Sequence, residues 1–116
     1  MKTYTSKGQI IEDLKNQLKS SKSQLEKGIQ RIYEYQTSSE KVSRDVKFNN
    51  GVGFKPQDAY MLSSFAQQLK RGYHLSEKQT YIAKKLMPKY AGQLVNQSIQ
   101  KGLIVKTLLG NYIFAS

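Results

Sequence analysis

The sequence predicts a mainly α-helical protein that ends in a β-hairpin. Apolar residues recur at helical spacing through residues 10–35, and shorter helical patterns punctuated by glycine and proline follow from residue 56. Near the C-terminus, two β-branched or aromatic runs flank a Gly110-Asn111 turn, which is typical of a hairpin. At 116 residues the chain has room for one modest domain and one extended element.

The first expected element is a long amphipathic helix from about Gln9 to about Val42. Its apolar stripe consists of Ile10, Leu14, Leu18, Leu25, Ile29, Ile32 and Tyr35. The stripe lapses at Ser21 and Gly28 lowers helicity, so a bend or break is expected there. The stripe needs a partner, and the sequence leaves open a second copy of the helix in a homodimer, the second half of this chain, or a different protein.

Residues 47–56 are rich in turn formers and cannot continue the helix. This segment divides the chain into two expected units. Residues 1–47 would form a helix for assembly or for docking on a partner, in the manner of a coiled coil. Residues 48–116 would form a small basic domain.

Two helices are expected at the start of the second half. The first begins near Pro56, where the missing N–H of proline does no harm, and ends at Gly72. The second follows Ser76, a good N-cap. Gln79, three residues further on, completes a capping box.

Pro88 starts a third helix, or kinks the second helix into it, and Gly102 ends that helix. Three helices followed by a two-stranded hairpin is the order of a winged helix, a variant of the helix-turn-helix fold, in which the third helix enters the major groove of DNA. The same order also suits a small helical domain that binds proteins, and both interpretations stay open.

The second half is strongly basic. From Phe48 to Ser116 there are nine basic residues and two acidic ones, against ten and six in the first 47 residues, which together give the net charge of +11. A surface with so one-sided a charge favours an anionic partner. Nucleic acid is the commonest such partner, because each neutralised phosphate releases counterions. Duplex DNA is therefore the expected partner.

The candidate nucleic-acid-binding residues lie in the second and third helices and in the hairpin. The lysines are expected to contact phosphates, whereas Asn and Gln of the third helix can pair with adenine or form a plain solvated face. Lys78, Lys85 and Lys89 share a face if the helix continues through Pro88. The full set is Lys78, Lys84, Lys85, Lys89, Gln93, Asn96, Gln97, Gln100, Lys101 and Lys106.

The composition argues against an enzyme. The chain has no cysteine for a thiol nucleophile or a zinc site, and its one histidine, His74, is not accompanied by paired carboxylates. We therefore expect no metal and no cofactor. The N-terminus lacks a signal-peptide core, and no apolar run approaches the roughly 20 residues that span a bilayer. A cytoplasmic protein without a membrane partner is expected.

Residues 50–94 carry a family resemblance. The pattern runs through Gly51-Val52-Gly53-Phe54, Asp58, Leu75-Ser76-Glu77-Lys78-Gln79, Lys84-Lys85-Leu86 and Lys89-Tyr90-Ala91-Gly92-Gln93-Leu94. It resembles a short module of phage and bacterial nucleic-acid processing proteins that often precedes the motor of Swi/Snf-type helicases. The resemblance implies a nucleic-acid-processing context and a mobile-element origin. No helicase motor is among the 116 residues, so it implies no ATPase activity.

The leading hypothesis is a small non-enzymatic DNA-binding accessory protein of phage or mobile-element origin, which binds by phosphate contacts and helix insertion. The alternative is a protein-binding phage factor that inhibits or recruits a host nucleic-acid enzyme. A third hypothesis is binding of RNA or single-stranded DNA. It rests on the eight tyrosines, since aromatic rings stack on unpaired bases.

Overall fold

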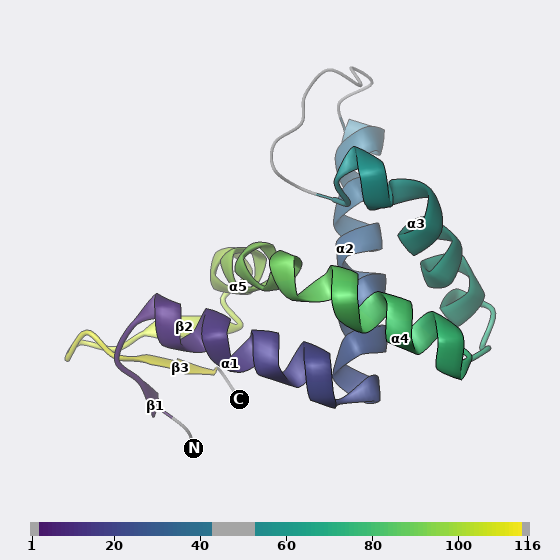
Figure 1. Cartoon of the computed structure of the whole chain (residues 1–116). Helices are drawn as coiled ribbons and strands as arrows, with labels where there is room; N and C mark the ends of the chain where they lie inside the picture. The colour runs from purple at the N-terminus through teal and green to yellow at the C-terminus, as the bar shows by residue number, and fades with distance from the viewer. Residues whose placement is uncertain (1–2, 43–52, 115–116) are drawn as a thin grey trace.

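A computed structural model describes residues 3–42 and 53–114, which form helices and a small sheet (Figure 1). The elements in chain order are β1 (Thr3–Tyr4), α1 (Lys7–Ser20), α2 (Lys22–Val42), α3 (Pro56–Lys70), α4 (Glu77–Leu86), the 3₁₀ turn η1 (Met87–Tyr90), α5 (Ala91–Gln100), β2 (Ile104–Lys106) and β3 (Tyr112–Phe114). The prediction of a mainly α-helical fold with a C-terminal hairpin is confirmed.

The expected long N-terminal helix is broken at Ser21 into two helices that run in different directions (Figure 1). Ser21 has an extended backbone, and its N–H donates to the Gln17 carbonyl over 2.8 Å. Its hydroxyl accepts from the Gln24 N–H over 3.3 Å. Ser21 therefore caps the end of α1 and the start of α2, because a serine hydroxyl can replace a missing helical carbonyl.

Gly28 does not break the helix, since α2 continues through it. A Cβ atom at this position would lie 3.1 Å from Leu18 and 3.4 Å from both Met87 and Leu94. The glycine thus allows α1, η1 and α5 to approach α2 closely.

The apolar stripe of the first half packs within this chain. Leu18, Leu25, Ile29 and Ile32 are fully buried in one core with residues of α3, α4, η1 and α5. Of the three partners that the sequence left open, the stripe contacts the second half of its own chain. The core crosses the boundary drawn at residue 47, and these buried side chains are not exposed to a second copy or another protein.

The predicted hairpin is present, with Val105 opposite Ile113 in an antiparallel ladder. An unexpected third strand, β1, pairs with β3, so the sheet order among the described residues is β1-β3-β2. Tyr4 of β1 packs edge-on against Phe114 and donates its hydroxyl to Asp13 of α1 over 2.6 Å. Burial, followed by this bond, raises the pKa of Tyr4 to about 12.

Helix α4, η1 and α5 form one kinked rod along α1 (Figure 1). Pro88 lies within η1, so the interpretation of Pro88 as a kink is correct. Ile10, near the start of α1, is buried with Val95 of α5, whereas Lys22, just after α1, donates to the carbonyl of Leu75, just before α4. The rod and α1 therefore run antiparallel.

Candidate nucleic-acid interface

The outer face of α4 presents two of the predicted lysines. Lys78 and Lys85 are exposed on either side of Tyr81, which is 62% exposed, whereas Ala83 on the opposite side is fully buried. The capping box fixes where this helix starts. The Ser76 hydroxyl accepts from the Gln79 N–H over 3.1 Å, and the Gln79 side chain accepts from the Ser76 N–H. The predicted capping box is confirmed.

Lys85 lies over the ring of Tyr81, with Nζ 4.3 Å from the ring centroid. Such a cation–π contact directs the ammonium without neutralising it. Lys84, the third predicted lysine of α4, is half-buried. Against these three lysines, α4 contains one acidic residue, Glu77.

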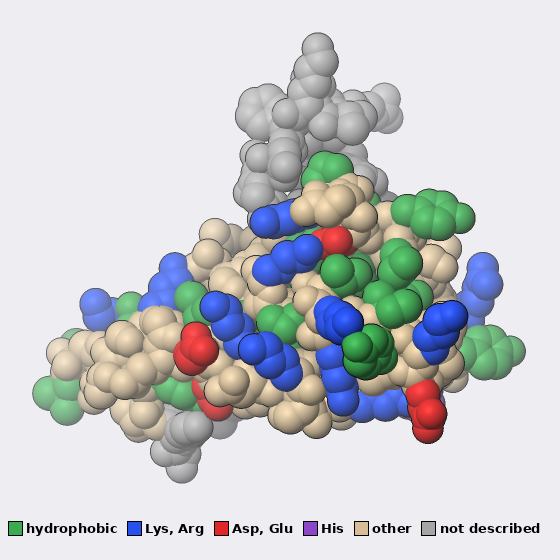
Figure 2. All heavy atoms as spheres, viewed as in Figure 1, with side chains coloured by type: hydrophobic (Ala, Val, Ile, Leu, Met, Phe, Trp, Pro, Cys, Tyr) green, Lys and Arg blue, Asp and Glu red, His purple; other side chains and the backbone are tan. Residues whose placement is uncertain are grey.

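Helix α1 adds lysines that the sequence analysis assigned to an assembly helix. Lys19 is exposed and the Lys15 side chain is 39% exposed, with Glu12 3.9 Å from the Lys15 ammonium. Figure 2 shows Lys and Arg side chains gathered over α1 and α4 with few acidic side chains among them. We call Lys15, Lys19, Lys78, Lys84 and Lys85 the basic face. The sequence did not show that α1 packs antiparallel to α4, so it did not predict that their lysines share a surface.

Lys89, predicted to bind nucleic acid, instead pairs with the carboxylate of Asp58 at the start of α3. Asp58 is only 4% exposed and also accepts a 2.6 Å hydrogen bond from the Tyr90 hydroxyl. Burial by itself would raise the pKa of Asp58. The bonds from Lys89 and Tyr90 and the charge of Lys89 outweigh burial and lower it. Because Asp58 already holds this ammonium, Lys89 does not belong to the free basic surface.

Gln93, predicted to face the DNA groove, is held by the backbone of Gly53. Its side-chain oxygen accepts from the Gly53 N–H over 2.7 Å, and its amide donates to the Gly53 carbonyl over 3.1 Å. Phe54 next to it donates its N–H to Gln36 and packs edge-on against Tyr90, with ring centroids 5.7 Å apart. The side chain of Gln93 therefore anchors the chain ahead of α3.

These contacts form one cluster, which we call the Asp58 clasp: Gly53, Phe54, Asp58, Lys89, Tyr90 and Gln93. All six belong to the pattern that carries the family resemblance. In this fold those positions join the start of α3 to η1 and α5. Contacts within the fold therefore explain the spacing of these six residues without a bound ligand.

The remaining predicted residues lie along α5 and the hairpin. Asn96 and Gln100 are exposed and Gln97 is half-buried. The Lys101 ammonium lies 4.6 Å from the Tyr35 ring centroid, and that of Lys106 lies 5.9 Å from the Tyr112 ring centroid. Both lysines are exposed, Lys101 just after α5 and Lys106 in β2. Figure 1 shows α5 at the end of the rod opposite the start of α4.

The hairpin tip, residues 107–111, exposes two leucines that the sequence analysis did not single out. Leu108 and Leu109 are 108% and 90% exposed. The tip is ordered by bonds from the Thr107 N–H to the Asn111 carbonyl and from the Gly110 N–H to the Thr107 carbonyl, over 2.7 and 2.9 Å. Gly110 supplies the positive φ that this turn needs. The two adjacent leucines form a small exposed apolar patch on a fixed turn.

Within residues 3–42 and 53–114, no cluster of three histidine, cysteine or acidic side chains is placed to hold a metal ion. In the same ranges, no helix combines the length and the apolar character needed to cross a bilayer. Comparisons of the chain with protein-family models, curated proteins and solved structures find no match.

Proposed function

We propose that this protein is a non-enzymatic DNA-binding accessory protein that contacts duplex phosphates through the basic face. The observation that carries the proposal is the charge of the rod and hairpin. From Lys78 to Ser116 the sequence has six lysines and no acidic residue. Lys78 and Lys85 extend from this stretch as exposed side chains, and Glu77, at the start of α4, is the one acid of the rod.

The mechanism is electrostatic attachment of adjacent helices to a phosphate backbone. Lysines of α1 and α4 replace counterions on the duplex, which gives affinity without sequence preference. Asn96 and Gln100 remain exposed amides that can meet base edges where α5 reaches a groove. Gln93 and Lys89 are assigned to the clasp and have no role in this binding.

A salt titration of duplex binding tests the proposal. Replacing Lys78 and Lys85 by Gln should reduce the slope of log affinity against log salt by about 2, because each phosphate contact contributes about 0.9. The matched control is Lys7→Gln with Lys70→Gln, two exposed lysines outside the basic face. An equal reduction of this slope in both double variants would disprove the assignment of the basic face. Wild-type affinity weaker than ~100 μM at low salt would disprove duplex binding.

A second candidate function, docking on a protein that processes nucleic acid, is favoured by the hairpin tip. The buried stripe of α1 and α2 no longer supports this alternative, but Leu108 and Leu109 offer an exposed apolar contact. The variant Leu108→Ser with Leu109→Ser should then lose a protein partner that co-purifies after nuclease treatment, while its duplex affinity stays unchanged. Loss of duplex affinity instead would assign the tip to DNA.

A further inference from the structure

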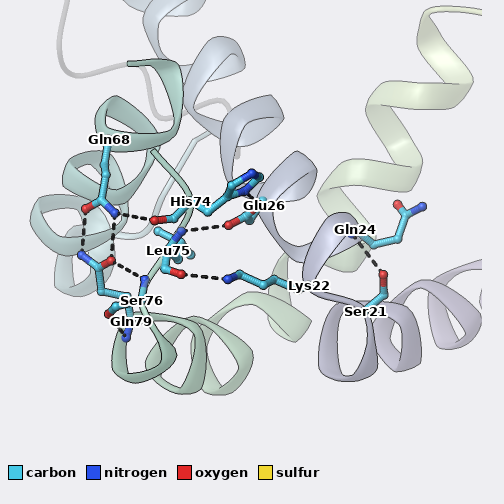
Figure 3. A network of polar contacts seen from close by, with 9 residues as sticks. All are labelled: Ser21, Lys22, Gln24, Glu26, Gln68, His74, Leu75, Ser76 and Gln79. Carbon is cyan, nitrogen blue, oxygen red and sulfur yellow. Dashed lines mark hydrogen bonds and ion pairs between the residues drawn. The ribbon is translucent and has the colours of Figure 1, made fainter. Parts of the chain in front are cut away.

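A cleft of about 640 Å³ lies between the first turns of α2 and the loop from α3 to α4. Its size is in the range of small-molecule sites. The residues that define its chemistry are Lys22, Glu26, Lys27, Leu69, Tyr73 and His74. Figure 3 shows Lys22 and Glu26 of α2 extending toward the loop that carries His74 and Leu75.

The loop wall of the cleft is fixed by polar bonds to α2. One oxygen of the Glu26 carboxylate accepts from the Leu75 N–H, and the other contacts Nδ1 of His74, both over 2.9 Å. Lys22 donates to the Leu75 carbonyl over 2.9 Å. The Gln68 amide also donates to the His74 carbonyl over 3.0 Å (Figure 3). The loop is thus held in one place before any ligand arrives.

Glu26 and Lys22 are already engaged by the loop, whereas Lys27 and the rings of Tyr73 and His74 are accessible. Lys27 is exposed, Tyr73 is 66% exposed and the His74 side chain is 82% exposed. Because a carboxylate only accepts hydrogen bonds, Nδ1 of His74 is the donor in this contact, and Glu26 does not use Nε2. A cation, a flat ring and an apolar wall at Leu69 therefore meet in one cleft.

We propose that this cleft binds an unpaired nucleotide, either free in solution or at the end of a single strand. The ammonium of Lys27 meets the phosphate, and the base stacks on the exposed ring of Tyr73. Aromatic stacking of this kind suits any base, because every base has a π-face. The cleft is formed by α2, the end of α3 and the loop that follows rather than by the outer face of α4, so it does not depend on duplex binding.

The experiment measures binding of the full chain to a blunt duplex, to the same duplex with a single-stranded overhang, and to a free mononucleotide. The overhang should bind about tenfold more tightly than the blunt duplex, within the range expected for one stacked base. Tyr73→Leu and Lys27→Gln should each abolish this preference. Tyr60→Leu and Lys7→Gln are the matched controls, since both side chains are exposed and lie outside the cleft.

The outcomes separate the two ligand sources and the two proposals. A mononucleotide that competes with the overhang identifies a site for free nucleotides, and an overhang preference without such competition identifies a site for strand ends. Equal affinity for blunt and overhanging duplex, together with no binding of the mononucleotide, overturns the cleft proposal and leaves duplex binding intact. Equal effects of Tyr73→Leu and Tyr60→Leu overturn it as well. A mononucleotide that binds while every duplex fails would retain the cleft and reject the basic face.

Discussion

The two halves of the α4–η1–α5 rod carry the same kinds of residue but use them differently. On α4, Lys78 and Lys85 extend from an exposed face. Immediately afterwards, Lys89 pairs with Asp58 and Gln93 holds the backbone of Gly53. Along this rod, the lysine and the glutamine that bind the start of α3 are therefore not available to a partner.

The cause of this difference is the burial of Asp58. A carboxylate removed from water is costly unless it is paired and hydrogen-bonded. Lys89 and Tyr90 meet that need, and the Tyr90 hydroxyl in turn accepts from the Lys55 N–H over 2.9 Å. The acid of α4, Glu77, lies exposed in the first turn. It does not require a lysine as Asp58 does.

The largest expected effect comes from breaking the clasp at its acid. Asp58→Ala leaves the Lys89 ammonium and the Tyr90 hydroxyl without their acceptor, and it should lower the free energy of unfolding by about 3 kcal/mol. Urea unfolding measures this change. The control is Glu77→Ala on α4, where a loss of about 0.5 kcal/mol or less is expected for an exposed acid. Similar losses at both positions would show that the two acids are equivalent.

The same clasp should make stability depend on acid. The pKa of Asp58 is lowered in the folded state from its ordinary value of 3.8, so its stabilising contribution is present above that value and is lost as the pH falls further through the folded pKa. Below about pH 4 the difference in unfolding free energy between the wild type and Asp58→Asn should shrink. A difference that stays constant from neutral pH to pH ~2 would contradict this assignment.

An intermediate effect is expected at Gln93. Gln93→Ala removes two hydrogen bonds to Gly53 and should cost about 1–2 kcal/mol of unfolding free energy. Gln100→Ala, at an exposed site of the same helix, should change stability by less than about 0.5 kcal/mol. Thermal or urea unfolding of both variants measures the contrast. If Gln93→Ala proves neutral, Gln93 becomes available again as a groove-facing residue.

The smallest effect on stability is expected on the outer face of α4. The double variant Lys78→Gln with Lys85→Gln should change the unfolding free energy by less than about 1 kcal/mol. The main interaction that it removes is the contact of Lys85 with the Tyr81 ring. Urea unfolding measures this change in the same preparations used for duplex binding. A large destabilisation would mean that these lysines, like Lys89, have a structural role.

Local signals in the sequence were sufficient where one segment decides its own structure. Pro56, the Ser76–Gln79 capping box, the kink at Pro88 and the hairpin turn at Gly110 each act over a few residues, and all four are present. The break of the first helix was also signalled, by the lapse of the apolar stripe at Ser21. Strand β1 was not predicted, because two residues give no periodicity and the strand exists only beside β3.

The candidate site depended on contacts between segments far apart in the chain. The charge excess, the helical face of Lys78 and Lys85, and the position of the hairpin follow from the sequence alone. The sequence alone does not show which cations remain free, because Lys89 is held by Asp58, 31 positions earlier as counted from their residue numbers. The lysines of α1 lie near those of α4 because the break at Ser21 lets one core bury both helices. The sequence thus determined the helices, the hairpin and the sign of the surface, and tertiary packing decided strand β1 and which side chains remain available to a partner.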